Sequence, residues 1–247
     1  MKVYTTDKIR NIVLLGHSGS GKTSLSESMA YQAELIQRQG TVVDGNTISD
    51  FDKQEIKRKM SIQTSVIPIP WEDCKINILD TPGSFDFLGE MEEALSAADA
   101  AVIVVSGKNG VEGGTNKAWE LCEKYHLPRM FFVTEMDIDD ASFRQVVEDL
   151  QETYGKKIAP FHLPIRKDEH FVGYINVVSD NAFLWNEKGE VYPCEIPEYS
   201  KENLELCSTA LKEAVAESSE SLMERYFAGE TFSEDEIRQA LRMNVAD

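Results

Sequence analysis

The fold is decided by Gly16-His17-Ser18-Gly19-Ser20-Gly21-Lys22-Thr23, an octapeptide between an apolar run (Ile12 to Leu15) and a helix-like segment that begins near Lys22. A glycine-rich turn of this kind lets successive backbone N–H groups point at a polyphosphate, and the helix N-terminus adds positive charge. We expect all eight residues to line this phosphate-binding loop. The Lys22 ammonium would meet the β- and γ-phosphates, and the Thr23 hydroxyl would ligate Mg²⁺. A turn without a ligand is the weaker interpretation, because every fixed position of the pattern is filled.

Short apolar runs and helix-like segments alternate on both sides of this loop. The continuous run Ala101-Val-Ile-Val-Val105 is typical of a strand buried on both faces. The alternation predicts an α/β fold, a P-loop NTPase with a doubly wound sheet that binds its ligand at the carboxyl ends of the strands. The expected strands are 11–15, 62–69, 75–79, 100–105 and 129–133, the expected helices are 23–38, 90–97, 116–125 and 141–154, and the expected switch-like loops are 39–60 and 81–89.

The pattern changes near Ala159, where shorter strand-like runs precede acidic helices. This change predicts a small α+β subdomain appended to the nucleotide-binding core. We therefore divide the chain into a core of residues 1–158 and an insert subdomain of residues 159–247. The expected strands of the insert are 161–165, 171–178, 182–186 and 191–193, and its expected long helix is 201–218.

Composition limits the classes of partner. The 43 acidic and 25 basic residues give a formal charge of −18, which opposes binding to a nucleic-acid phosphate backbone, so we expect no free DNA partner. The four cysteines include no C-x-x-C pair, which predicts reduced thiols in a cytoplasmic protein. No apolar run is long enough to span a membrane, and no membrane partner is expected.

A second motif, Asp80-Thr81-Pro82-Gly83, ends the third expected strand about 60 residues after the phosphate loop. An Asp at a strand terminus can hold Mg²⁺ through water, and the Gly83 N–H can touch the γ-phosphate. The tetrapeptide alone could be a Pro-Gly turn after any strand. Its position relative to the first motif favours the phosphate site.

Together the two motifs resemble a translational GTPase, and the residues around them resemble bacterial elongation factor G, most closely its divergent second paralogues. The resemblance implies an N-terminal GTP-binding domain that takes GTP or GDP with Mg²⁺, hydrolyses GTP on the ribosome and continues in further domains beyond residue 247. It also implies that the insert subdomain contacts the stalk proteins of the large ribosomal subunit. The stretches that carry the resemblance are 16–17, 80–87, 93–101, 110–112, 127–130 and 213–226.

Ser84 departs from this family at the position that follows the second motif, where a histidine usually orients the attacking water. A serine is too short to reach as an imidazole does, and it cannot carry positive charge toward the transition state. Lys22, Gly83 and Ser84 remain the expected catalytic residues. Because phosphoryl transfer depends on positioning and electrostatics, we expect hydrolysis to be slowed by about 10² to 10⁵ unless the ribosome supplies the missing group.

Ser61 occupies the position of a family threonine that closes on Mg²⁺ and the γ-phosphate. It keeps the hydroxyl and drops the methyl group, so Mg²⁺ ligation by Thr23, Ser61 and Asp80 is one expectation. The other is that Ser61 is merely the first outward-facing residue of the following strand. The short match in a loop leaves both open.

Base recognition in the family uses Asn-Lys-x-Asp, and the corresponding residues here are Thr134-Glu135-Met136-Asp137. The Asp137 carboxylate can accept hydrogen bonds from the guanine N1–H and N2–H₂ groups, each contributing about 1.5 to 3 kcal/mol. Thr134 lacks the amide, and Glu135 places an acid near a polyanion. We expect Thr134 and Asp137 to border the base and the affinity to be weakened; the alternative is a plain loop after a strand.

The family core has a sixth strand after the insert, and no such strand follows Leu241. We therefore expect a core without its last strand, whose fifth strand is an open edge at which a second copy could pair. Two other functions stay open. One is a degenerate nucleotide switch that hydrolyses little, which Ser84 and Glu135 favour. The other is a ribosomal protection or release-type factor with the same core.

Overall fold

The computed structural model describes residues 3–155, 158–167, 170–186 and 189–246, with side chains up to residue 241. Residues 1–134 and 135–247 form two compact units, each with its own sheet. The predicted division into domains after residue 158 stays a prediction. No helix in the described ranges combines the length and apolar character needed to cross a membrane.

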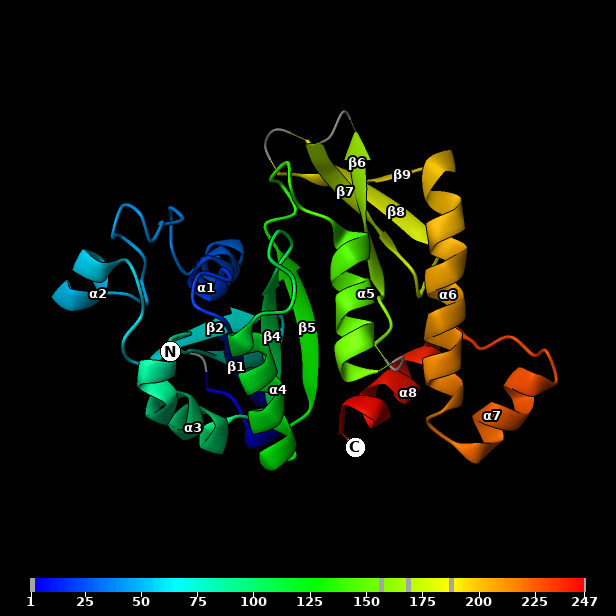
Figure 1. The fold of residues 1–247 in the computed structure, drawn as a ribbon, viewed down its shortest axis with the longest axis horizontal. Helices are drawn as coiled ribbons and strands as arrows, with labels where there is room; N and C mark the ends of the chain where they lie inside the picture. The colour runs from blue at the N-terminus through cyan, green and yellow to red at the C-terminus, as the bar shows by residue number, and fades with distance from the viewer. Residues whose placement is uncertain (1–2, 156–157, 168–169, 187–188, 247) are drawn as a thin grey trace. The chain divides into compact units, whose positions relative to one another are not determined.

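The first unit is built on a five-stranded sheet in the order β2-β3-β1-β4-β5 (Figure 1). Strand β2 is antiparallel to β3, and the other neighbours are parallel. The central strand β1 is covered on both faces, because consecutive residues Val13, Leu14 and Leu15 are all fully buried. The strands are β1 (Ile9–Gly16), β2 (Ser65–Trp71), β3 (Cys74–Asp80), β4 (Ala100–Ser106) and β5 (Arg129–Thr134).

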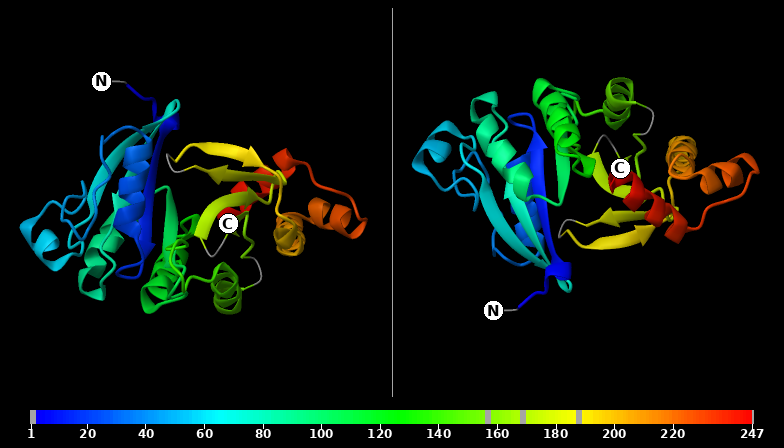
Figure 2. Two further views of the ribbon diagram at one scale, coloured as in Figure 1. Left: turned by 90° about the horizontal axis from the view of Figure 1, so that it is seen from above. Right: turned by 90° about the horizontal axis from the view of Figure 1, so that it is seen from below.

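Helices connect these strands in two directions. From β1 the chain moves through α1 to β3, on one side of β1, and it then crosses back to β4 and β5 on the other side. Because connections between parallel strands are right-handed, this reversal places helices on both faces of the sheet. Ala30 of α1 packs with Leu14 and Ile78, and α1 lies along the sheet (Figure 2). The doubly wound α/β prediction is thereby confirmed. The helices are α1 (Lys22–Gln32), α2 (Lys53–Arg58), α3 (Leu88–Ala97) and α4 (Gly113–Lys124), with short 3₁₀ turns η1 (Thr6–Lys8) and η2 (Phe85–Phe87).

Two local expectations were wrong. Helix α1 ends at Gln32 and not at Arg38, because Glu34 adopts a left-handed backbone with φ 56°. The loop expected from residue 39 to 60 contains α2, which begins at an Asp52 cap whose side chain accepts the Gln54 N–H. This short helix lies in the loop that also carries Ser61.

The second unit contains a four-stranded antiparallel sheet in the order β6-β7-β8-β9, and helices that share its core. Leu163, Ile175, Leu211 and Val215 are buried in this core. The predicted insert strands and long helix are confirmed within a few residues. The elements are α5 (Phe143–Tyr154), β6 (His162–Lys167), β7 (His170–Asn176), β8 (Asn181–Trp185), β9 (Val191–Cys194), η3 (Glu198–Ser200), α6 (Lys201–Ala216), α7 (Glu220–Phe227) and α8 (Glu234–Ala246).

Candidate functional site

The octapeptide loop connects β1 to α1 at the place where the chain's direction across the sheet reverses. Ligands of open α/β sheets bind at such reversal points. Gly16 has to be glycine, because a Cβ there would lie 2.3 Å from the Val104 carbonyl oxygen of the neighbouring strand. Gly21 is the N-cap of α1, and its φ of 87° is a left-handed conformation that favours glycine. The predicted loop therefore has the backbone shape that its glycines indicated.

Lys22 begins α1 and is 6% exposed. Its ammonium donates hydrogen bonds to the carbonyl oxygens of Gly16 (3.0 Å) and His17 (2.8 Å). Burial lowers the pKa of Lys22 to about 8, against the opposing attraction of Asp80, Asp50 and Glu112. A buried ammonium at the rim of the loop is well placed to bind a phosphate oxyanion.

A cavity of about 190 Å³ lies over this loop. Gly83 closes one side of it, since a Cβ at this residue would lie 2.5 Å from Lys22 Nζ and 2.6 Å from the Ser18 nitrogen. The cavity is smaller than the roughly 300–1,000 Å³ of typical small-molecule sites, which suits the phosphate end of a nucleotide. Its lining consists of Ser18, Gly19, Gly21, Lys22, Thr23, Ser24, Val42, Asp50, Lys59, Met60, Ser61 and Gly83.

Three predicted metal ligands meet beside the cavity. The hydroxyl oxygens of Thr23 and Ser61 are 3.2 Å apart, and Ser61 precedes β2 rather than beginning it. Asp80, at the end of β3, is 1% exposed and accepts a 3.0 Å hydrogen bond from the Ser26 hydroxyl. Burial raises the pKa of Asp80 to about 6, although nearby hydroxyls and Lys22 oppose the shift.

The residues in this corner fit a divalent cation. Asp80 Oδ1, Asp50 Oδ2 and Ser49 Oγ are buried and form no hydrogen bond, which leaves polar oxygens without partners. Mg²⁺ prefers hard oxygen ligands and commonly combines one or two carboxylates with substrate phosphates and water. The described residues hold no group of three or more His, Cys, Asp or Glu suited to a metal, so hydroxyls and phosphate oxygens would complete this corner.

Asp50 was missed by the sequence analysis. It is 4% exposed, it lines the cavity, and burial raises its pKa while the Ser61 hydroxyl acts in the opposite direction. The residue stands in a loop with no periodic pattern, and only the folding of that loop onto α1 brings it to the site. No signal in the sequence alone marks it.

The His17 side chain also has a role that the sequence did not indicate. Its Nδ1 accepts a hydrogen bond from the Gly114 N–H (3.2 Å), and its Nε2 lies 3.6 Å from Glu112 Oε1. The ring therefore joins the phosphate loop to the first turn of α4. The backbone carbonyl of the same residue accepts a hydrogen bond from Lys22.

The predicted base-binding residues fall on either side of the division between the two units. Thr134 ends β5, and its hydroxyl donates to the Ser20 carbonyl oxygen at 2.7 Å, so it ties this strand to the phosphate loop. Asp137 is exposed in the loop of the second unit that follows. Their joint contact with a base stays a prediction.

Ser84 does not line the cavity. Its hydroxyl accepts the Asp86 N–H at 3.4 Å and caps the η2 turn. This contact gives the serine a local structural role, and its predicted catalytic role stays a prediction.

A glycine-rich loop at the reversal point of a doubly wound sheet, with a buried lysine and a hydroxyl–carboxylate corner, defines a phosphate-loop nucleotide-binding domain. The family model of the elongation factor Tu GTP-binding domain matches residues 7–239. The chain belongs to this family of GTPases.

Within this family, the chain is similar to elongation factor G. It is 37% identical to elongation factor G of Thermotoga petrophila over 238 residues, which cover 96% of the chain and 34% of that protein. A crystal structure of a protein from Thermus thermophilus matches it with a TM-score of 0.89 and 34% identity, over 96% of the chain and 36% of that protein. The chain thus spans about a third of the length of these relatives. The predicted resemblance to elongation factor G and the predicted P-loop GTPase fold are confirmed, and the two other functions are not favoured.

Proposed function

We propose that this chain is the GTP-binding module of an elongation factor G-like ribosomal translation factor, which couples binding and hydrolysis of GTP to action on the ribosome in the cytoplasm. The observation that carries the proposal is the buried Lys22 ammonium beneath a glycine loop that opens into a phosphate-sized cavity. The similarity to elongation factor G over 96% of the chain supports it.

In this proposal, different residues bind the phosphates, the metal and the base. The backbone N–H groups of residues 16–23 and the Lys22 ammonium bind the phosphates, and the Gly83 N–H meets the γ-phosphate. Thr23 and Ser61 would hold Mg²⁺, and the buried carboxylates of Asp80 and Asp50 would support it. Mg²⁺, when bound, neutralises charge on the phosphate oxygens. Asp137 reads the guanine edge, while the Thr134 hydroxyl is already bonded to the loop.

Hydrolysis is slow in the isolated chain, because Ser84 offers no imidazole to orient water and its hydroxyl is engaged with Asp86. The ribosome is the partner that would complete the reaction. Further domains of the whole protein would contact it, as the length of the relatives indicates.

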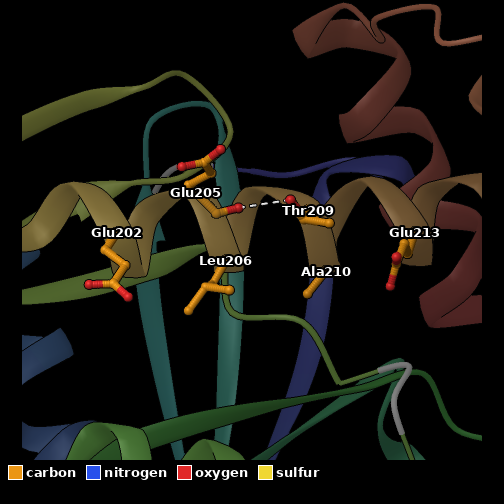
Figure 3. A pocket seen from close by; sticks show the side chains of 6 residues that line it. All are labelled: Glu202, Glu205, Leu206, Thr209, Ala210 and Glu213. Carbon is orange, nitrogen blue, oxygen red and sulfur yellow. Dashed lines mark hydrogen bonds between the residues drawn. The ribbon is translucent and has the colours of Figure 1, made fainter.

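We propose that the stalk proteins of the ribosome contact the second unit. Along α6 a shallow, open hollow, lined by this helix alone, leaves Leu206 63% exposed among carboxylates (Figure 3). A partner there must supply basic side chains and an apolar contact. The hollow is lined by Glu202, Glu205, Leu206, Thr209, Ala210 and Glu213.

Calorimetric titration of GTP, GDP and ATP in Mg²⁺ buffer tests the proposal, followed by hydrolysis assays with and without ribosomes. We expect GTP and GDP to bind, ATP to bind more weakly, and Lys22→Ala to weaken both guanine nucleotides by about 10- to 100-fold through loss of charged hydrogen bonds. Ser84→His should speed hydrolysis on ribosomes. A chain that ignores GTP, or a Lys22→Ala variant that binds it unchanged, would refute the proposal.

A further inference from the structure

We propose that Glu55 is a positioning residue that holds Ser61 in place for Mg²⁺ and the γ-phosphate, and thereby makes the site prefer GTP to GDP. The inference rests on the proposed function. Glu55 lies in α2, the short helix within the loop between α1 and β2. Its proposed role is to hold the backbone around Ser61, which requires no contact with the nucleotide or the metal.

The Glu55 side chain is buried and collects backbone N–H groups. The residue is 2% exposed. One carboxylate oxygen, Oε1, accepts hydrogen bonds from Ile62 (3.0 Å) and Gln63 (3.1 Å), and the other, Oε2, accepts from Asp52 (3.1 Å). A buried carboxylate with three N–H donors is a strong anchor, because each bond involves a charged acceptor.

These bonds fix the chain on both sides of Ser61. Ile62 and Gln63 follow it and are held by the Glu55 carboxylate. Met60 precedes it, and its N–H donates to the Glu55 backbone carbonyl at 3.3 Å. Glu55 therefore holds the chain both before and after the serine, whose hydroxyl lies 3.2 Å from that of Thr23.

A serine needs such an anchor more than a threonine does. Its side chain has no methyl group to pack against neighbours, so its hydroxyl is placed chiefly by the backbone. In nucleotide switches of this kind the loop hydroxyl joins the site when a γ-phosphate and its Mg²⁺ are present. Loosening the anchor should thus weaken GTP binding and leave GDP binding almost unaffected.

The test compares affinities for fluorescent GTP and GDP analogues in Mg²⁺ buffer for the unmodified chain, Glu55→Ala, Glu55→Gln and Gln54→Ala. Gln54 is the matched control, because it precedes Glu55 in α2 with an exposed side chain. Supporting groups of metal ligands typically contribute 10- to 100-fold, so Glu55→Ala should weaken GTP by about 10-fold and GDP by less than about twofold. Glu55→Gln keeps one acceptor oxygen and should fall between, whereas Gln54→Ala should match the unmodified chain.

A second comparison separates positioning from general destabilisation. In a Ser61→Ala background there is no hydroxyl to position, so adding Glu55→Ala should no longer change the ratio of GTP to GDP affinity. An unchanged ratio of GTP to GDP affinity in Glu55→Ala would overturn the inference, whether both affinities fall equally or neither falls. A change in this ratio that persists without the Ser61 hydroxyl would also overturn it. Failure of the unmodified chain to bind GTP would instead refute the proposed function itself.

Discussion

Among single residues, Asp80 carries the clearest dependence on pH. Its pKa in the folded chain is about 6, raised by burial from an ordinary value of 3.8. The folded state thus binds this proton more tightly than the unfolded state does. The resulting stabilisation is fully present below pH about 4 and is lost as the pH rises through about 6. At neutral pH the buried carboxylate therefore destabilises the metal-free protein.

We predict that Asp80→Asn stabilises the chain at pH 7 in the absence of Mg²⁺ and nucleotide, by up to about 3 kcal/mol for a shift of about two pKa units. The gain should shrink as the pH falls through about 6 and be small at pH 4, close to the ordinary pKa of 3.8, where the unfolded carboxyl is itself partly protonated. Urea unfolding between pH 4 and 7 measures it. Equal stability of parent and variant at pH 7 would contradict the prediction, and GTP with Mg²⁺ should stabilise the parent more than the variant.

The residues predicted from the sequence are those whose role is set by the local chain. Lys22 and Thr23 were found because the loop pattern fixes them relative to one strand and one helix. Asp50 and Glu55 were not found, because their positions depend on how a long loop folds back over α1 and toward β2. A buried carboxylate that binds backbone N–H groups leaves no periodic signal in the sequence.

Among the elements, α4 meets the phosphate loop through a glycine. Gly114 lies in its first turn, and a Cβ there would lie 2.4 Å from the His17 Cα and 2.9 Å from the His17 nitrogen. Contacts this short force either the helix or the loop to shift. The position of α4 is therefore coupled to the shape of the loop that binds phosphate.

We predict that Gly114→Ala destabilises the chain by about 1–3 kcal/mol, as overpacking of a close contact does, and weakens GTP and GDP alike. The matched control is Gly89→Ala in the first turn of α3, where a Cβ would meet nothing within 4 Å. That substitution should instead stabilise by up to about 1 kcal/mol, since alanine favours a helix over glycine. Denaturation curves and nucleotide titrations check both variants, and a Gly114→Ala protein as stable as the parent would contradict the argument.

The elements that sequence patterns predicted best are the continuous apolar strands. Val104 and Val105 are both buried although they face opposite sides of the sheet, which is what an unbroken apolar run indicates. Helix α2 escaped prediction because its six residues, Lys53–Arg58, are too short to show a helical period. Its capping pair, Asp52 and Glu55, was the one local signal available.

For the whole molecule, the two units have separate cores. Ile78 and Leu14 belong to the core of the first unit, and Ile175 and Val215 to the core of the second. The change of pattern near Ala159 indicated two parts, and the two compact units of the structure divide between residues 134 and 135. Helix α5 precedes this change of pattern and nevertheless belongs to the second unit. A sequence pattern reports a change in secondary structure, whereas the core against which a helix packs depends on contacts between residues far apart in the chain.

We predict that Ile175→Ala, which empties a fully buried position of the second core, lowers the stability of that unit by about 2–5 kcal/mol and leaves GTP affinity unchanged. Its counterpart Ile78→Ala, equally buried in the core of the first unit and two residues before Asp80, should weaken both stability and GTP binding. Because nucleotide stabilises only what binds it, GTP at about 100 times its Kd should add about 2.7 kcal/mol to the free energy of unfolding of the unit that carries the phosphate loop. Calorimetric unfolding with and without GTP and Mg²⁺ resolves the two responses. If Ile175→Ala reduced GTP affinity as much as Ile78→Ala does, the two cores would have to be coupled through the nucleotide site.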